Sequence, residues 1–333
     1  MPSLSVLELA PVGQGSTPAA ALLASVELAR LAERLGYTRV WVAEHHNMPG
    51  IASSSPPVLI AHLAAATSTI RVGAGGVMLP NHPSLVVAEQ FGMLEALHPG
   101  RIDLGIGRAP GTDPVTAAAL RRSADALGAD EFPQQLRDLL AFFDGTHPQI
   151  TAVPGKGYRP AIWILGSSDF GAQVAGMLGL PFSFAHHFAP ANTEAAVEIY
   201  RQSFRPSGEF EQPYVMLGVP VVCADTDERA RWLAAPSSVS FVRLRQGRPT
   251  PLPSPEEAAE YTFTPFEREL LRSWTKPLVV GSPETVHAGL DDLAARTGAD
   301  ELMITTLVHG VEDRLRSYEL VASTSVTRTL RTC

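Results

Sequence analysis

The chain has 333 residues, a net charge of −8 and a pI near 5.7, so neither a nucleic acid nor an anionic membrane is an expected partner. Its two cysteines, Cys223 in an apolar run and Cys333 at the last position, provide neither a disulfide framework nor a cysteine metal site. The first residues lack a secretion-signal pattern, and no stretch reaches the roughly 18 apolar residues of a membrane span, so we expect a cytoplasmic protein.

Strand-like apolar runs alternate with helix-type patterns along the chain. Thr17 and Pro18 predict the start of a helix, and Gly36 predicts its end. The predicted strands cover residues 3–9, 40–43, 70–79, 101–107, 161–165, 182–185, 215–224 and 301–305. The predicted helices cover residues 19–35, 54–69, 84–97, 114–127, 132–143, 170–180, 192–204, 265–274, 282–297 and 311–323.

This alternation is typical of a parallel sheet with crossover helices. Eight strands favour an α/β fold of the (β/α)8 TIM-barrel type, in one domain over residues 1–333. An open doubly wound sheet is the alternative. Residues 236–277 break the pattern after the seventh strand, and we interpret them as an insertion over the barrel mouth: either a lid or a surface excursion without a gating role.

The predicted strand at 40–43 ends directly in Glu44, His45, His46 and Asn47. In a parallel α/β barrel the carboxyl ends of the strands carry the chemistry, and imidazoles there exchange protons near neutral pH. Glu44, His45 and His46 are therefore candidate site residues. A pair of loop histidines without a role would give the same sequence, because two adjacent histidines are a weak signal.

Glycines lie inside the predicted third strand, where they weaken a strand and mark a bulge or a close backbone approach. Gly75 and Gly76 make room for a ligand, and they also allow a non-proline cis peptide. Tight packing between neighbouring elements explains the same glycines.

Two consecutive strand ends carry groups that suit an anion. Arg108 follows the fourth strand on a glycine-rich turn, and Ser167 and Ser168 follow the fifth strand just before a helix. The turn at Arg108 is neither a P-loop nor a Rossmann fingerprint, because the glycine and lysine spacings differ. A surface salt bridge for Arg108 and simple N-capping by Ser168 are the alternatives. Together the two features predict a phosphate-bearing cofactor at the barrel mouth.

A second histidine pair, His186 and His187, follows the sixth strand in the way that His45 and His46 follow the second. We count His186 and His187 as candidate pocket residues. The chain shows no His-x-His or His-x-x-x-His pattern with a carboxylate, so no metal site is predicted.

With these segments the chain resembles the bacterial luciferase-like flavin monooxygenases. The likeness runs through VWVAEHHNMPG, HPGRIDLGIGRAPGTD, WILGSSDFGAQVAGMLGLPFSFAHHF and ELMITT, and it covers nearly everything except 236–277. The resemblance implies a TIM barrel, a homodimer and reduced FMN, which a separate NAD(P)H:flavin reductase supplies. It also implies that O2 is the co-substrate and that a small apolar organic substrate is oxidised through a C4a-peroxyflavin.

The resemblance also implies roles for single residues. His45 matches a catalytic acid or base beside the flavin; Arg108, Ser167 and Ser168 match contacts to the phosphate. Gly75 and Gly76 match the strand end that lies against the isoalloxazine ring. Where the luciferases carry a reactive cysteine, this chain has Gly107, so cysteine-dependent behaviour does not transfer, and the likeness to single-chain relatives implies no light emission.

Two other functions remain open on the same barrel. One is hydride transfer with a deazaflavin (F420), and the other is flavin binding without turnover. For the homodimer, the alanine-rich helices at 54–69 and 84–97 offer a face of low charge, although packing against the barrel explains the same pattern.

Overall fold

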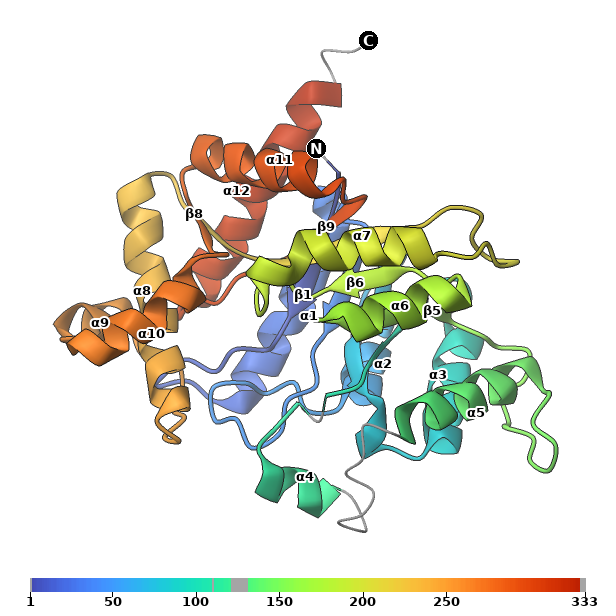
Figure 1. Ribbon diagram of the computed structural model, residues 1–333. Coiled ribbons are helices and arrows are strands. Elements are labelled where there is room, and N and C mark those ends of the chain that lie inside the picture. Colours follow the sequence, from blue (N-terminus) through green and yellow to red (C-terminus); the bar gives the residue numbers. More distant parts are fainter. Residues whose placement is uncertain (1, 110, 121–130, 330–333) are drawn as a thin grey trace.

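The protein is described here by a computed structural model that covers residues 2–109, 111–120 and 131–329 (Figure 1). Eight parallel strands form its centre: β1 (Ser3–Glu8), β2 (Arg39–Val42), β3 (Arg71–Met78), β4 (Ile102–Gly107), β5 (Ala161–Gly166), β6 (Phe182–Phe184), β7 (Val215–Cys223) and β9 (Glu301–Thr305). Strands β1 to β7 pair in chain order, β7 pairs with β9, and β9 pairs with β1. The predicted TIM barrel is therefore confirmed, and the open-sheet alternative is wrong.

Helices between the strands cover the outside of the barrel. They are α1 (Pro18–Leu35), α2 (Pro56–Ala66), α3 (Ser84–Leu97), α4 (Pro114–Leu120), α5 (Phe132–Asp144), α6 (Asp169–Leu178), α7 (Thr193–Ser203), α11 (Pro283–Thr297) and α12 (Val311–Thr329). The predicted helix at 114–127 starts as expected in α4, and its second half lies outside the described residues. Short 3-10 turns at Leu79–Asn81 and Pro190–Asn192 follow β3 and β6.

The ends of α1 show how local chemistry sets an element. The Thr17 hydroxyl accepts a hydrogen bond from the Ala20 amide, and Pro18 occupies the first turn, where its missing N–H costs nothing. At the other end Gly36 adopts the left-handed conformation, with φ of 79°, and its amide bonds to the last-turn carbonyls. Both predicted ends of this helix are confirmed.

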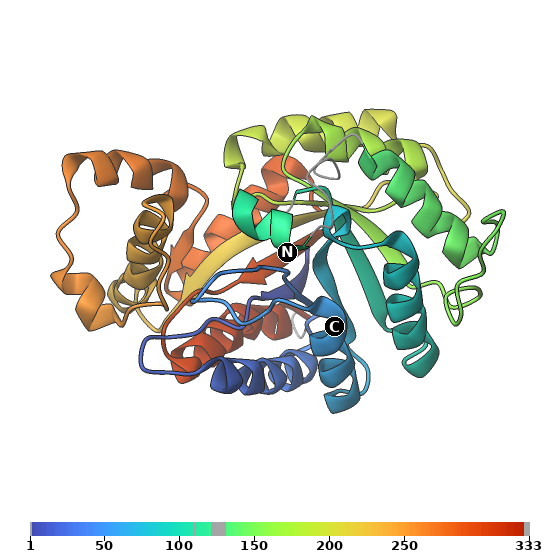
Figure 2. The same ribbon diagram turned by 90° about the horizontal axis from the view of Figure 1, so that it is seen from below.

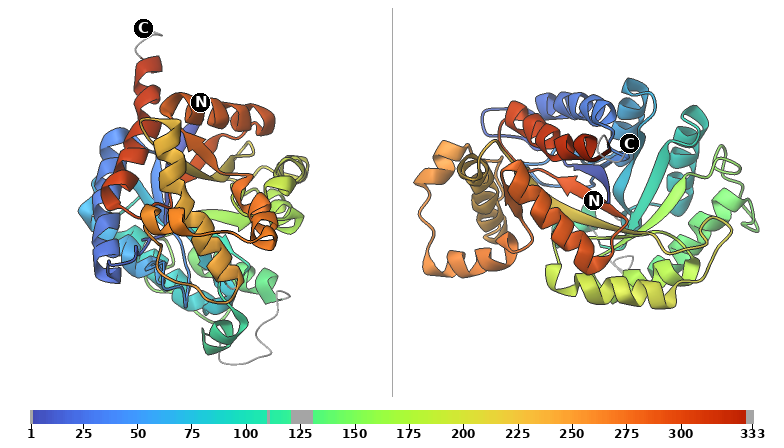
Figure 3. Two further views of the ribbon diagram at one scale, coloured as in Figure 1. Left: turned by 90° about the vertical axis from the view of Figure 1, so that its left-hand side faces the viewer. Right: turned by 90° about the horizontal axis from the view of Figure 1, so that it is seen from above.

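The region after β7 differs from the expectation. Helix α8 (Asp227–Arg245) runs through Pro236, where we placed the start of an insertion, and α9 (Pro255–Glu260) and α10 (Pro265–Thr275) follow. Pro236 lies inside α8 and is buried. A proline removes one backbone hydrogen bond of the helix, and we attribute the continuation of α8 to the packing of its buried residues against the rest of the fold. These helices project from one side of the barrel (Figures 2 and 3).

A ninth strand, β8 (Val279–Gly281), lies outside the barrel and pairs with the end of β7. It has only three residues and no alternating pattern, so sequence patterns do not predict it. No helix among the described residues is long and apolar enough to cross a membrane.

Candidate active site

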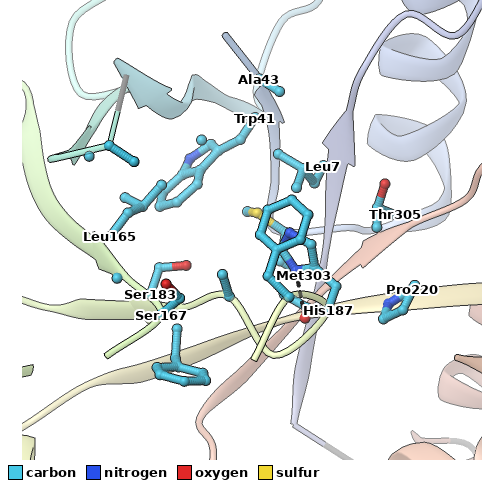
Figure 4. Close-up of a pocket in the computed structure, with 18 of the residues that line it drawn as sticks. Leu7, Trp41, Ala43, Leu165, Ser167, Ser183, His187, Pro220, Met303 and Thr305 are labelled. Atoms are coloured by element: carbon cyan, nitrogen blue, oxygen red, sulfur yellow. Dashed lines mark hydrogen bonds between the residues drawn. The ribbon is translucent and has the colours of Figure 1, made fainter. Parts of the chain in front are cut away.

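A cavity of about 290 Å³ opens among the strand ends (Figure 4). It brings together most of the residues that the sequence singled out, and the predicted residues on its wall are Glu44, His45, Gly75, Arg108, Ser167, Ser168 and His187. Gly76, His46 and His186 are not among the lining residues. Segments that are distant in sequence therefore meet in one site, as expected for the carboxyl ends of barrel strands.

Arg108 and the two serines meet at one side of the cavity, which we call the anion end. The Arg108 guanidinium lies 4.2 Å from the ring centre of Phe170, a residue in the first turn of α6, so β4 and the start of α6 are in contact. Ser168 is the N-cap of α6, yet its hydroxyl makes no capping bond. Within the described part of the chain, Arg108 has no carboxylate partner. The donors at this end are left for a ligand.

Glu44 is a buried carboxylate that holds His46, one member of the first histidine pair, in place. One of its oxygens accepts hydrogen bonds from His46 Nε2 at 3.0 Å and from His82 Nε2 at 2.9 Å. The other accepts from the Met78 amide at 3.0 Å. Burial by itself would raise the pKa of Glu44. The hydrogen bonds outweigh this effect, so the pKa lies below its ordinary value. Glu44 therefore stays ionised and ties the loop after β2 to the end of β3.

His45 lines the cavity beside this carboxylate. Its Nδ1 lies 3.4 Å from the Gly111 carbonyl, and because a carbonyl only accepts, Nδ1 carries the hydrogen of this long bond. Burial, the largest influence, lowers the pKa of His45, so the ring is neutral and Nε2 keeps a lone pair.

His187 lines the cavity from the end of β6 in a similar way. Its Nδ1 donates to the Gly218 carbonyl at 3.0 Å, which leaves Nε2 as an acceptor (Figure 4). Gly218 is required for this position, since a Cβ there would lie 2.7 Å from Nδ1. Burial lowers the pKa of His187 to about 4, so it is neutral at pH 7. Its neighbour His186 bonds instead to Thr193 Oγ1 at 2.7 Å.

The sequence left two explanations for Gly75 and Gly76: room for a ligand, and tight packing between neighbouring elements. A Cβ on Gly75 would come within 2.9 Å of both Leu7 and Trp41, and a Cβ on Gly76 would come within 2.8 Å of the Gly105 carbonyl. Close packing thus requires both glycines, while Gly75 also faces the cavity. The peptide bond between them is cis, as the sequence analysis allowed.

The cavity floor was not predicted as part of the site. Trp41 is fully buried, lies edge-on to Trp163 with 5.2 Å between ring centres, and donates from Nε1 to Asp103 at 2.9 Å. Asp103 also pairs with Arg39 and Arg71, so ion pairs at the opposite end of the strands fix the floor. Charged residues near several strand starts were the sequence signal for this network.

In the described ranges, no group of three or more histidine, cysteine, aspartate or glutamate side chains is arranged to hold a metal ion. The polar groups of the cavity are instead an arginine, hydroxyls, neutral imidazoles and the single carboxylate of Glu44, whose oxygens already accept several hydrogen bonds. Such a set suits an organic ligand with an anionic tail.

Comparison with known proteins shows which family the chain belongs to. The family described as luciferase-like monooxygenase matches residues 3–301. The chain belongs to this family. A luciferase-like monooxygenase from Escherichia coli (strain K12) is 44% identical over 96% of this chain and 95% of its own length. The YvbT protein of Bacillus subtilis (strain 168) is 50% identical over 96% and 95%. A member of the luciferase-like family is expected to be a monooxygenase.

Solved structures extend the comparison to the fold. Apo-MsnO8 superposes with a TM-score of 0.90 at 42% identity and covers 97% of this chain and 98% of its own. The oxygenating component of 3,6-diketocamphane monooxygenase from Pseudomonas putida, in complex with FMN, has a TM-score of 0.70 at 18% identity over 96% of each chain. An F420-dependent secondary alcohol dehydrogenase reaches 0.71 at 13% identity, covering 95% and 97%. Identities this low show a common barrel and nothing about the ligand.

Proposed function

We propose that the protein is a flavin-dependent monooxygenase that uses reduced FMN and O2 to oxidise a small apolar organic substrate. The convergence of Arg108 with the Ser167–Ser168 turn carries this proposal, because it places anion-binding groups at one side of a cavity that also contains His45 and Gly75. Membership of the luciferase-like monooxygenase family supports the reaction class, and the resemblance to the flavin monooxygenases supports the choice of a flavin.

The residues present fit the phosphate of FMN. Arg108 offers a guanidinium fork that pairs with no carboxylate of residues 2–109, 111–120 or 131–329, and Ser168 offers a hydroxyl that no capping bond uses. The first amides of α6, a helix of ten residues, point from the same place with the positive end of the helix dipole. An anion held here would fix one end of a flavin, and the ring would extend toward Gly75 and His45.

Bound reduced FMN supplies the electrons with which O2 is activated. The protein's own part is to hold the reactants, exclude water and move a proton. His45 is neutral and its Nε2 carries a lone pair, so it can accept a proton from a reacting group at the ring and return it later. Leu7, Trp41 and Met303 form an apolar floor that keeps water from the reaction.

The name of one relative also supports the proposal that an organic substrate is oxidised. The N-acetyl-S-alkylcysteine monooxygenase of Bacillus subtilis (strain 168) is 35% identical over 96% of this chain and 97% of its own length. We take from it that an organic compound is oxidised, and we transfer no substrate.

Anaerobic titration with chemically reduced FMN, followed by mixing with O2, tests the proposed function. We expect saturable binding of reduced FMN and oxygen uptake that depends on the protein. Absence of reduced-FMN binding would overturn the proposal. A parallel titration with reduced F420 decides against the hydride-transfer alternative if FMN binds more tightly. Binding without any protein-dependent oxygen uptake would favour the flavin-storage alternative.

We further propose that reduced FMN comes from a separate NAD(P)H:flavin reductase. The resemblance to the luciferase-like flavin monooxygenases supports this proposal, because it implies that reduced FMN reaches the enzyme from a separate protein. Oxygen uptake should therefore require either a reductase with NAD(P)H or FMN that has been reduced chemically. Uptake with NAD(P)H and oxidised FMN alone would contradict this division of labour.

A homodimer through α2 and α3 completes the proposal. These packed helices expose several large apolar side chains to solvent: Val58 at 71%, Met93 at 54% and Leu97 at 67% exposure. Large apolar side chains exposed on two neighbouring helices are a feature of many subunit interfaces. Sedimentation of the wild-type protein should give twice the mass of one chain, and Met93→Glu should reduce the measured mass to that of a single chain. A monomeric wild-type protein would contradict the proposal.

A further inference from the structure

The cavity has a second side, which we call the apolar end. It is formed by Pro220, Val222, Ser237, Trp274, Leu278 and Thr305, which come from β7, α8, α10, the segment before β8, and β9. None of these described lining residues is ionisable. In Figure 4, Pro220 and Thr305 lie across the cavity from Ser167. The barrel order agrees, because β7 and β9 are not neighbours of β4 or β5.

Trp274 forms a fixed part of this end. Its ring is stacked on Phe241 of α8, with 4.5 Å between ring centres and 11° between the planes. Hydrogen bonds also hold α8 and α10 against each other. Glu267 closes a capping box at the start of α10 and accepts hydrogen bonds from Gln246 at 2.7 Å and from Tyr261 at 2.9 Å. A ring held on one face by a neighbour is a defined wall rather than a loose side chain.

A charged group at the apolar end would lose its water and meet no counter-ion among the six residues that form this end. Burying an unpaired carboxylate or ammonium group is strongly unfavourable, whereas an alkyl chain gains free energy on leaving water. The available polar groups are neutral: the Ser237 and Thr305 hydroxyls, with the acceptor Nε2 of His187 as a third group on the cavity wall. Such a set accommodates at most a hydroxyl, carbonyl or similar neutral group.

From this geometry we infer that the apolar end is the subsite for an uncharged, largely aliphatic molecule, and that Trp274 sets the length of molecule that fits. The inference deepens the proposed function by naming the substrate class, and it rests on that function for the identity of the bound molecule as a substrate. The anion end and the apolar end then hold the two reactants in one cavity, on whose wall His45 lies.

Calorimetric titration of the flavin-free protein with 1-hexanol, 1-octanol and 1-decanol tests the inference. The charged comparison is octanoate, titrated in parallel with 1-octanol into Arg108→Ala, because Arg108 at the anion end of the same cavity would otherwise bind the carboxylate. We expect affinity to rise about fourfold for each added methylene until the chain reaches Trp274, and then to stop rising. Octanoate should bind at least about tenfold more weakly than 1-octanol, because its carboxylate has no partner.

Trp274→Ala should allow the rise to continue for at least two further carbons. Trp232→Ala is the matched control, since Trp232 lies on α8, contacts Arg229 and does not line the cavity. It should keep the wild-type limit. If Trp274→Ala does not fold, Trp274→Phe keeps a ring against Phe241 and should shift the limit by a smaller amount.

Equal binding of octanoate and 1-octanol, or the same length limit in wild type and the folded Trp274 variant, would overturn the inference. The measurement contains no flavin. Failure of reduced FMN to bind would therefore overturn the proposed function and leave this result standing.

Discussion

Two adjacent histidine pairs follow β2 and β6, and each pair divides its members in the same way. One ring of each pair, His45 or His187, lines the cavity with its Nδ1 toward a glycine carbonyl. The other ring points away and bonds to a neighbour: His46 to Glu44, and His186 to Thr193. Adjacent residues in an irregular turn face different surroundings, so a repeated dipeptide yields one site residue and one supporting residue.

The pairs differ in what lies behind them. In the first pair, His46 bonds to the buried, ionised Glu44. The charge of Glu44 favours a proton on His45, although burial lowers the pKa of His45 overall. No carboxylate among the described residues bonds to either member of the second pair, and burial lowers the pKa of both His186 and His187 to about 4. For the proposed reaction the difference favours His45 as the residue that exchanges a proton, and it leaves His187 as a neutral ring whose Nε2 is available as a hydrogen-bond acceptor.

The largest effect should come from removing the ring of His45. We expect His45→Ala to lower turnover by about 10²- to 10⁴-fold, because the general acid–base group is lost, and to leave reduced-FMN affinity nearly unchanged. Turnover is measured as protein-dependent oxygen uptake with substrate. His46→Ala is the control from the same pair and should lower turnover only severalfold. Equal losses in the two variants would remove the distinction within the pair.

The next effect concerns the carboxylate behind the first pair. Glu44→Gln should lower the free energy of unfolding by about 1–3 kcal/mol, because the amide cannot accept all the bonds that Glu44 now accepts. Urea unfolding measures the change. Glu27→Gln on the exposed face of α1 should stay within about 0.5 kcal/mol of wild type. A Glu44→Gln protein as stable as the control would show that the hydrogen bonds accepted by Glu44 do not contribute to stability.

The smallest effect should appear in acid, at the second pair. The folded pKa of His186, about 4, lies below its ordinary value of 6.5, so the unfolded chain binds more protons between these pH values. Stability should therefore fall as pH drops from about 6.5 to 4, and be unaffected by this group above 6.5. His186→Asn should reduce that slope by at most one proton, or about 1.4 kcal/mol per pH unit. An unchanged slope in urea titrations would contradict the assignment.

Much of the barrel could be predicted because its signals are local. Caps such as Thr17 and Gly36 and short apolar runs fix where elements begin and end, and their alternation fixes the topology. The prediction failed at α8 and β8. Pro236 is normally a helix breaker, and only burial against the rest of the fold explains why the helix continues.

The site was predicted in part, for a similar reason. Strand-end residues such as Arg108 and Ser168 could be found because a barrel brings all strand ends together. Which histidine of a pair faces inward could not, because that depends on turn geometry and on partners such as Gly218. Trp274 was missed as well, since its place in the cavity depends on how α10 packs on α8.

The central claim is that Arg108 and the Ser167–Ser168 turn hold the phosphate of a flavin whose ring lies beside His45. Titration of wild type and Arg108→Ala with reduced FMN and with reduced riboflavin, which lacks the phosphate, tests it most directly. We predict that Arg108→Ala weakens FMN binding by about 10- to 100-fold, the effect of losing a charge-assisted contact, and changes riboflavin binding by less than about threefold. Equal weakening of both flavins, or of neither, would contradict the account.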